Sequence, residues 1–129
     1  MDQEILVKEF QKAAVQVDKR YGPVALMLLV APDEGTLDSW NVIVSAHGLD
    51  SKARGEAVRE FSDTLRKTLN KKFWPVVTRA TVLRTSDPFV QAFTRRYAAL
   101  DAGSTLEAVS VSGVDIPRAV IVETGRQAA

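Results

Sequence analysis

The side chains best suited to chemistry gather where an apolar segment, residues 40–46, gives way to a polar turn. Ser45, His47, Asp50 and Ser51 follow one another closely there, and His47 is the only histidine of the chain. An imidazole titrates near neutral pH and suits a general acid or base. If a helix begins after this turn, its free backbone N–H groups also offer a place for a phosphate or carboxylate. The turn is therefore our candidate ligand-binding site.

The same turn also has a structural interpretation. Asp50 or Ser51 is a good N-cap for a following helix, Leu49 can pack as a hydrophobic staple, and Gly48 relieves a tight turn. A Ser-His-Asp triad is less favoured, because triad members normally come from separate parts of a chain. We prefer the structural interpretation and expect no catalytic residue. Binding of a small ligand or phosphate at this turn, with or without catalysis, stays open as an alternative.

A second candidate site is basic. Arg66, Lys67, Lys71 and Lys72 precede the aromatic pair Phe73-Trp74. Cations can bind a phosphate backbone and an aromatic ring can stack on a base, so nucleic-acid binding is a further alternative. However, 17 basic against 16 acidic residues give a net charge of only +1, which is not typical of a nucleic-acid-binding domain. We prefer a solvated helix end whose cations complement the helix dipole, and we do not expect nucleic acid as a partner.

The sequence does not indicate a metal or cofactor site. Asp33, Glu34 and Asp38 surround Gly35, but their spacing fits no calcium loop. One histidine and no cysteine leave too few ligands for zinc. No glycine-rich phosphate loop or nucleophile motif is present. We therefore expect no metal and no cofactor, and we lean towards a protein that is not an enzyme.

Hydrophobic periodicity predicts the elements that position these residues. Apolar side chains recur at helical spacing in three segments: 2–20, 50–72 and one that opens with Ser86-Asp87-Pro88. Short apolar or alternating runs predict five strands: 24–30, 40–46, 76–84, 105–111 and 114–123. The short loop between the first two strands favours an antiparallel hairpin. Pro117 indicates that its part of the last strand is an edge or a bulge.

This order, α-β-β-α-β-α-β-β, predicts one α+β domain over residues 1–124 with a flexible tail at 125–129. We expect an antiparallel or mixed sheet of about five strands with the helices mainly on one face. The longest apolar run, 24–31, is short of the roughly 20 residues of a membrane helix. The first residues also lack the apolar core of a signal peptide. We expect a soluble, cytoplasmic protein without a membrane partner, and the lack of cysteine is compatible with that compartment.

Three stretches resemble a group of small bacterial α+β proteins to which no activity is assigned. They are Trp40-Asn41-Val42-Ile43-Val44-Ser45-Ala46, Ser86-Asp87-Pro88-Phe89 and the closing hairpin from Gly113 to Ala119. The resemblance spans residues 5 to 124. It departs at Ala46-His47-Gly48, where those proteins are expected to have Ala-Pro-Trp. It implies a stand-alone bacterial domain and adds no catalytic residue.

Without a catalytic pattern, the sequence favours a non-catalytic binding or protein-interaction module. We expect this module to form homo-oligomers, because the closing hairpin with Pro117 offers an edge strand and edge strands commonly pair with another chain. Trp40 is expected in the core, with a pocket or a subunit contact as the alternative.

Overall fold

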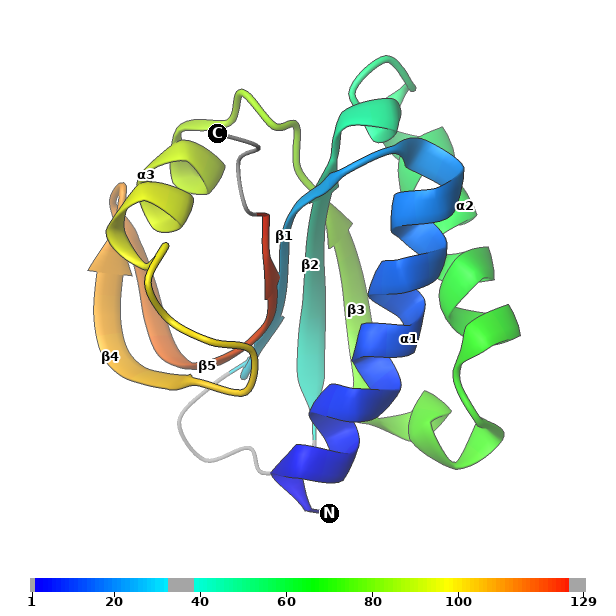
Figure 1. Ribbon diagram of the computed structural model, residues 1–129, viewed down its shortest axis with the longest axis horizontal. Coiled ribbons are helices and arrows are strands. Elements are labelled where there is room, and N and C mark those ends of the chain that lie inside the picture. The colour runs from blue at the N-terminus through cyan, green and yellow to red at the C-terminus, as the bar shows by residue number, and fades with distance from the viewer. Residues whose placement is uncertain (1, 33–38, 126–129) are drawn as a thin grey trace.

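The computed structural model of the protein describes residues 2–32 and 39–125. A single five-stranded sheet organises this part of the chain (Figure 1). The elements, in chain order, are α1 (Gln3–Tyr21), β1 (Val24–Val30), β2 (Trp40–Ala46), η1 (His47–Leu49), α2 (Arg54–Thr68), η2 (Lys71–Val76), β3 (Val77–Val82), α3 (Pro88–Arg96), β4 (Thr105–Val111) and β5 (Val114–Thr124). Apart from the short 3-10 segments η1 and η2, this is the predicted order, and the α+β class is confirmed.

The sheet is mixed, with the strand order β3-β2-β1-β5-β4. β1 runs antiparallel to β2 and β5, and β4 runs antiparallel to β5. β2 and β3 are parallel. A parallel pair needs a long crossover, and α2 supplies it. The crossover places β3 at one edge of the sheet, while β4 forms the other.

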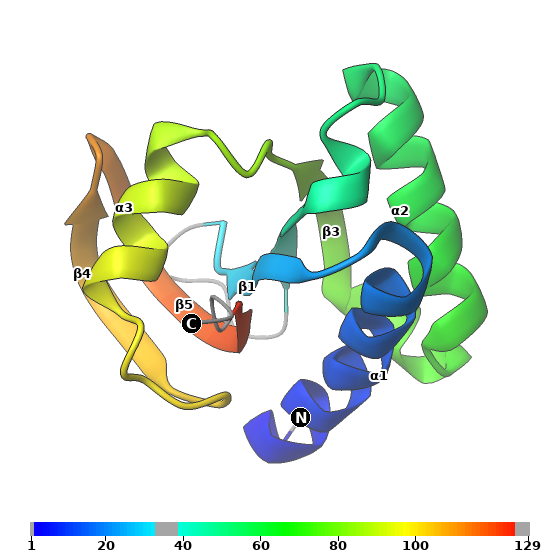
Figure 2. The same cartoon turned by 45° about the horizontal axis from the view of Figure 1, so that its top comes forward.

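Helices cover both faces of the sheet. α1 and α2 lie on one face and α3 lies on the other, within the curl of β4 and β5 (Figures 1 and 2). The prediction of helices mainly on one face therefore holds for α1 and α2 and needs correction for α3. β1 shows why: Met27 and Leu29 belong to the core under α1 and α2, whereas Leu26 and Leu28 belong to the core under α3. Its continuous apolar run is that of a strand buried on both faces.

The second helix begins later than predicted. α2 starts at Arg54, and its N-cap, Ala53, makes no side-chain capping bond. The expected caps are therefore wrong: Ser51 is exposed, and the carboxylate of Asp50 accepts hydrogen bonds from Thr85 instead. The helix also ends before residue 72, because the chain turns into η2, whose N-cap is Asn70.

Pro117 lies in a stretch of β5 that has a single neighbour. β5 pairs with β1 only from Ala119 to Thr124, and it pairs with β4 over Val114 to Val120. The β4–β5 ladder is interrupted opposite Pro117, where Ala108 has a φ of 51°. Because proline has no N–H to donate, it is tolerated where a ladder bond is missing.

The described part of the chain ends with Gly125 packed against β1. The N–H of Gly125 donates to the carbonyl of Ala25 at 2.7 Å, so the first residue of the predicted tail belongs to the folded part. The rest of that tail and the acidic residues Asp33, Glu34 and Asp38 lie outside the described residues. Within the ranges 2–32 and 39–125, no helix is both long enough and apolar enough to span a membrane.

Candidate functional site

The turn that follows β2 brings only two of its four candidate residues, His47 and Asp50, near each other. Ser45 is fully buried, and its hydroxyl has no hydrogen-bond partner among the described residues. It pairs with Leu26, and paired strand residues share a face of the sheet, so Ser45 faces the core under α3. The side chain of His47 is 84% exposed, and its Nδ1 lies 4.0 Å from Oδ2 of Asp50. The turn thus holds one buried hydroxyl and one solvated imidazole.

The remaining residues of this turn join elements to one another. A Cβ on Gly48 would lie 2.3 Å from the carbonyl oxygen of Tyr21, so glycine allows the turn to approach the end of α1. Leu49 is buried in the core. Trp40, at the start of β2, is 4% exposed, which confirms its predicted place in the core. The geometry of this turn is that of a structural junction.

The basic cluster is divided among several surfaces. Lys67 lies beside Gln16, Lys19 and Arg20 of α1, whereas Arg66 faces β3. The ammonium group of Lys71 lies 6.0 Å from the ring centroid of Trp74, and that of Lys72 lies over Phe73.

The aromatic pair is divided as well. Phe73 is 2% exposed and lies in the core, whereas Trp74 is 41% exposed. Only part of the basic cluster therefore stays near an accessible aromatic ring.

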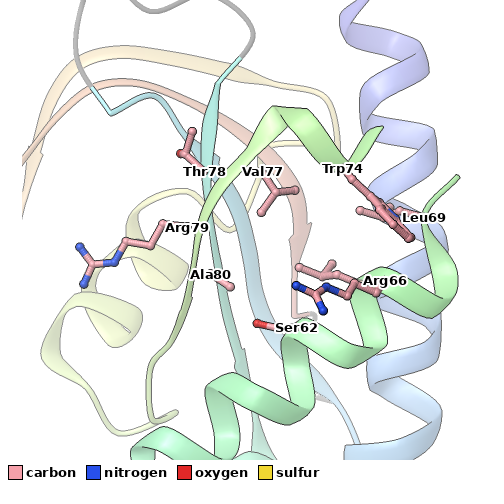
Figure 3. Close-up of a pocket in the computed structure, with 9 residues that line it drawn as sticks. Ser62, Arg66, Leu69, Trp74, Val77, Thr78, Arg79 and Ala80 are labelled. Atoms are coloured by element: carbon pink, nitrogen blue, oxygen red, sulfur yellow. The ribbon is translucent and has the colours of Figure 1, made fainter. Parts of the chain in front are cut away.

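A groove that the sequence did not reveal lies beside this tryptophan. It has a volume of about 470 Å³ and separates α2 and η2 from the edge strand β3 (Figure 3). Its lining consists of Ser62, Leu65, Arg66, Leu69, Trp74, Val77, Thr78, Arg79 and Ala80. The residues from α2 are spaced by three and four positions and therefore form one stripe of the helix.

The bottom of the groove is apolar and its rim is partly exposed. Leu65 and Leu69 are 4% and 5% exposed and belong to the core. Val77 packs against the same core from β3. Trp74 stands at the rim beside Leu69 (Figure 3). A large, partly exposed aromatic ring over a buried apolar floor is typical of a contact surface for another molecule.

The edge of β3 provides unpaired backbone groups along the groove. The N–H of Leu83 donates to the carbonyl of Val44 in β2 at 2.9 Å. Because backbone groups alternate in direction along a strand, those of Val82 and Ala80 point away from β2. β3 has no neighbouring strand on that side in the described sheet. The groove therefore borders a row of free donors and acceptors.

The guanidinium of Arg66 gives the α2 wall of the groove a positive charge. Its lining contains Arg66 and Arg79 and no carboxylate. No carboxylate within the described ranges forms an ion pair with either arginine. Arg66 lies on the α2 side near Trp74, while Arg79 projects from β3 away from α2 (Figure 3). An incoming carboxylate would therefore meet an uncompensated guanidinium at Arg66.

Four groups with a clearly displaced pKa lie outside the groove. They are Glu9, Tyr21, Lys52 and Glu60. Burial and the hydrogen bond to Glu60 raise the pKa of Tyr21. The hydrogen bonds that Lys52 and Tyr21 donate lower the pKa of Glu60. Tyr21, Lys52 and Glu60 form one network, with Tyr21 Oη 2.9 Å and Lys52 Nζ 3.0 Å from the Glu60 carboxylate, and this network connects α1 to α2. Glu9 lies apart from it and pairs with Lys12 and the N–H of Asn70.

The described residues contain no cluster of side chains that could bind a metal ion. Among residues 2–32 and 39–125, no three histidine, aspartate or glutamate side chains gather as a metal site would require.

Comparisons with protein-family models, curated proteins and solved structures found no match to this chain. The resemblance to small bacterial α+β proteins therefore stays a prediction.

Proposed function

We propose that this protein is a non-catalytic interaction module that binds an extended polypeptide segment along β3. The observation that carries the proposal is the free edge of β3 beside the apolar groove under Trp74. In binding by strand addition, main-chain hydrogen bonds to the edge supply affinity, and alternate side chains of the segment enter pockets. The groove and the outward backbone groups of Ala80 and Val82 provide these two components side by side.

The other edge of the sheet is less suited to this role. The outer strand there, β4, carries the positive φ of Ala108 opposite Pro117 and the exposed charge of Glu107. Such irregularities protect an edge from pairing. β3, in contrast, keeps a regular register with β2 from Arg79 to Val82. We therefore assign partner binding to β3 and not to the closing hairpin.

Proline at position 80 tests the proposal. The N–H of Ala80 points outward, so Ala80→Pro removes a donor for an incoming strand and keeps the bonds to β2. The probes are three fluorescein-labelled peptides of about ten residues with the repeats Val-Thr-Glu-Thr, Val-Thr-Thr-Thr and Val-Thr-Lys-Thr. Valine and the varied residue then lie two positions apart, on the same face of the added strand. We expect at least one peptide to bind in fluorescence anisotropy and Ala80→Pro to abolish that binding.

The matched control is Ala80→Ser, which keeps the backbone donor. Circular dichroism and thermal unfolding of both variants check that the sheet remains. The proposal is wrong if Ala80→Pro binds the peptides as tightly as the parent protein does, or if the parent protein binds none of them.

Self-association is a second candidate, because the same free edge of β3 can pair with β3 of another copy. Sedimentation velocity over a series of protein concentrations up to the micromolar range measures whether the chain is a monomer or a dimer. A dimer that Ala80→Pro converts to a monomer would support this candidate, and a monomer at all concentrations would remove it.

We further propose the bacterial cytoplasm as the compartment of the module. A chain without cysteine is suited to that reducing environment. Fractionation of the source cells, followed by detection with an antibody, tests this assignment.

A further inference from the structure

We propose that the segment bound along β3 is acidic and that one of its carboxylates pairs with Arg66. This inference rests on the proposed function and adds the chemistry of the partner. Side chains two positions apart on an added strand point to the same face, roughly 7 Å apart. One such side chain would pack against Trp74 and Leu69, and the next would reach the guanidinium of Arg66.

The positive charge of Arg66 is uncompensated. Arg66 lines the groove and has no carboxylate partner among the described side chains. A guanidinium offers a planar fork that fits a carboxylate through two hydrogen bonds. Ser62 precedes Arg66 by four positions on the same stripe of α2 and adds a hydroxyl to this wall of the groove.

The charge of Arg66 lies next to an apolar anchor, Trp74. Trp74 is 41% exposed above the buried side chain of Leu69, and tryptophan and arginine are the residue types that most often dominate binding energy at interfaces. Arg66 stands on the same side of the groove (Figure 3). Trp74 and Arg66 together therefore predict a bound segment whose inward face has an apolar residue followed, two positions on, by an acidic one.

A second copy of this chain fits the groove less well. Pairing β3 with β3 of another copy would bring two positively charged grooves together, with Arg79 of each copy on the same short edge. Like charges across paired strands are destabilising. Charge complementarity thus favours an acidic segment from another protein.

Nucleic acid also fits less well than an acidic polypeptide. A bound single strand would need the four cations of the basic cluster to form one row beside Trp74. Arg66 and Lys71 lie near Trp74, but Lys67 faces α1 and Lys72 lies over the buried ring of Phe73. The free main-chain groups of β3 match another polypeptide backbone, which offers donors and acceptors at the same spacing.

The three peptides test the inference with Arg66→Gln and Lys67→Gln. We expect the glutamate peptide to bind about tenfold more tightly than the threonine peptide, and the lysine peptide to bind most weakly. Arg66→Gln should remove most of this preference, whereas Lys67→Gln, on the neighbouring residue but facing α1, should keep it. Added salt should weaken binding of the glutamate peptide.

Several results would overturn the inference. Equal affinity for the three peptides, all abolished by Ala80→Pro, would keep strand addition and reject the acidic preference. A glutamate preference that is unaltered by Arg66→Gln would reject the assignment to that residue. If a single-stranded oligothymidine binds more tightly than the peptides and Arg66→Gln abolishes that binding, the partner is a nucleic acid and not a polypeptide. If the protein forms a dimer and this dimer binds none of the peptides, the partner of β3 is a second copy of the chain. Absence of binding by any probe would remove the proposed function itself.

Discussion

The carboxylate of Asp50 holds Thr85 through both its backbone N–H, at 2.9 Å, and its side-chain hydroxyl. The two residues belong to the segments that follow β2 and β3, which lie at the same end of the sheet because these strands are parallel. The side chain of Asp50 is 26% exposed, so these bonds are partly shielded from water. They fix the path of the chain toward Asp87, the N-cap of α3.

Replacing Asp50 should therefore destabilise the fold. Asp50→Ala leaves the N–H and hydroxyl of Thr85 without their acceptor, and we expect a loss of about 1 to 3 kcal/mol in the free energy of unfolding. Urea denaturation measures this loss. The neighbouring exposed residue gives the control, because Ser51→Ala should change stability by less than about 0.5 kcal/mol. Equal effects of the two substitutions would show that the contact contributes nothing.

Glu9 makes part of the stability dependent on pH. Its carboxylate accepts hydrogen bonds from the N–H of Asn70 at 2.7 Å and from Lys12 at 2.8 Å. Burial opposes ionisation, but these bonds and the charges of Lys12 and Lys72 outweigh it and lower the pKa of Glu9. A lowered folded-state pKa means that the stabilisation is complete above the unfolded-state pKa and is lost as the pH falls through the folded-state pKa.

The expected result is a stability difference between the parent protein and Glu9→Gln that narrows in acid. Urea denaturation from near-neutral pH down through the usual titration range of glutamate, about 4.3 in the unfolded chain, follows this difference. Glu4→Gln, an exposed position on the same helix, serves as the control and should show little narrowing. A difference for Glu9→Gln that stays constant over this range would contradict the account.

Two glycines should respond to alanine in opposite directions. A Cβ at position 48 would lie 2.3 Å from the carbonyl oxygen of Tyr21, whereas a Cβ at position 55 meets nothing within 4 Å. Gly48→Ala should cost about 1 to 3 kcal/mol, because backbone must shift to admit it. Gly55 is the second residue of α2, and Gly55→Ala should stabilise the fold by roughly 0.4 to 1 kcal/mol, because alanine restricts the unfolded chain. Thermal and urea unfolding measure both, and a stabilising Gly48→Ala would refute the steric argument.

Substitutions at the adjacent aromatic residues Phe73 and Trp74 should affect different properties, stability at Phe73 and peptide binding at Trp74. Phe73 is buried, so Phe73→Ala should cost about 3 to 5 kcal/mol of stability. Trp74→Ala removes a partly exposed ring and should change stability far less, while it weakens binding of the glutamate peptide by at least about tenfold. Leu100→Ala, at an exposed apolar residue outside the groove, should leave binding unchanged. Full peptide affinity in Trp74→Ala would remove Trp74 from the binding surface.

The sequence predicted the elements well because periodicity is a local property. The buried run of β1 and the Asp87-Pro88 start of α3 each carry their signal within a few residues. The capping role expected of Asp50 failed because its partner, Thr85, is 35 positions away along the chain. A cap rule considers neighbours in sequence, whereas here a tertiary contact competes for the same oxygen atoms.

The groove could not be predicted for a related reason. Arg66 and Ser62 look like ordinary polar residues on the solvent-facing side of a helix. They become the wall of a groove only because the α2 crossover makes β3 parallel to β2 and leaves it at the sheet edge. Trp74 gave a partial signal, since it is followed by Pro75, but its exposure depends on the turn that η2 makes.

The position of β1 between β2 and β5 affects how the protein is made. Among the strands of the described residues, β1 comes first in sequence, yet its second neighbour, β5, comes last. During synthesis, Leu26 and Leu28 therefore emerge long before the strand that completes their sheet. Such long-range pairing slows folding and prolongs the exposure of apolar strands. In the nascent chain, β1 therefore lacks its partner on the β5 side until residue 124 has left the ribosome.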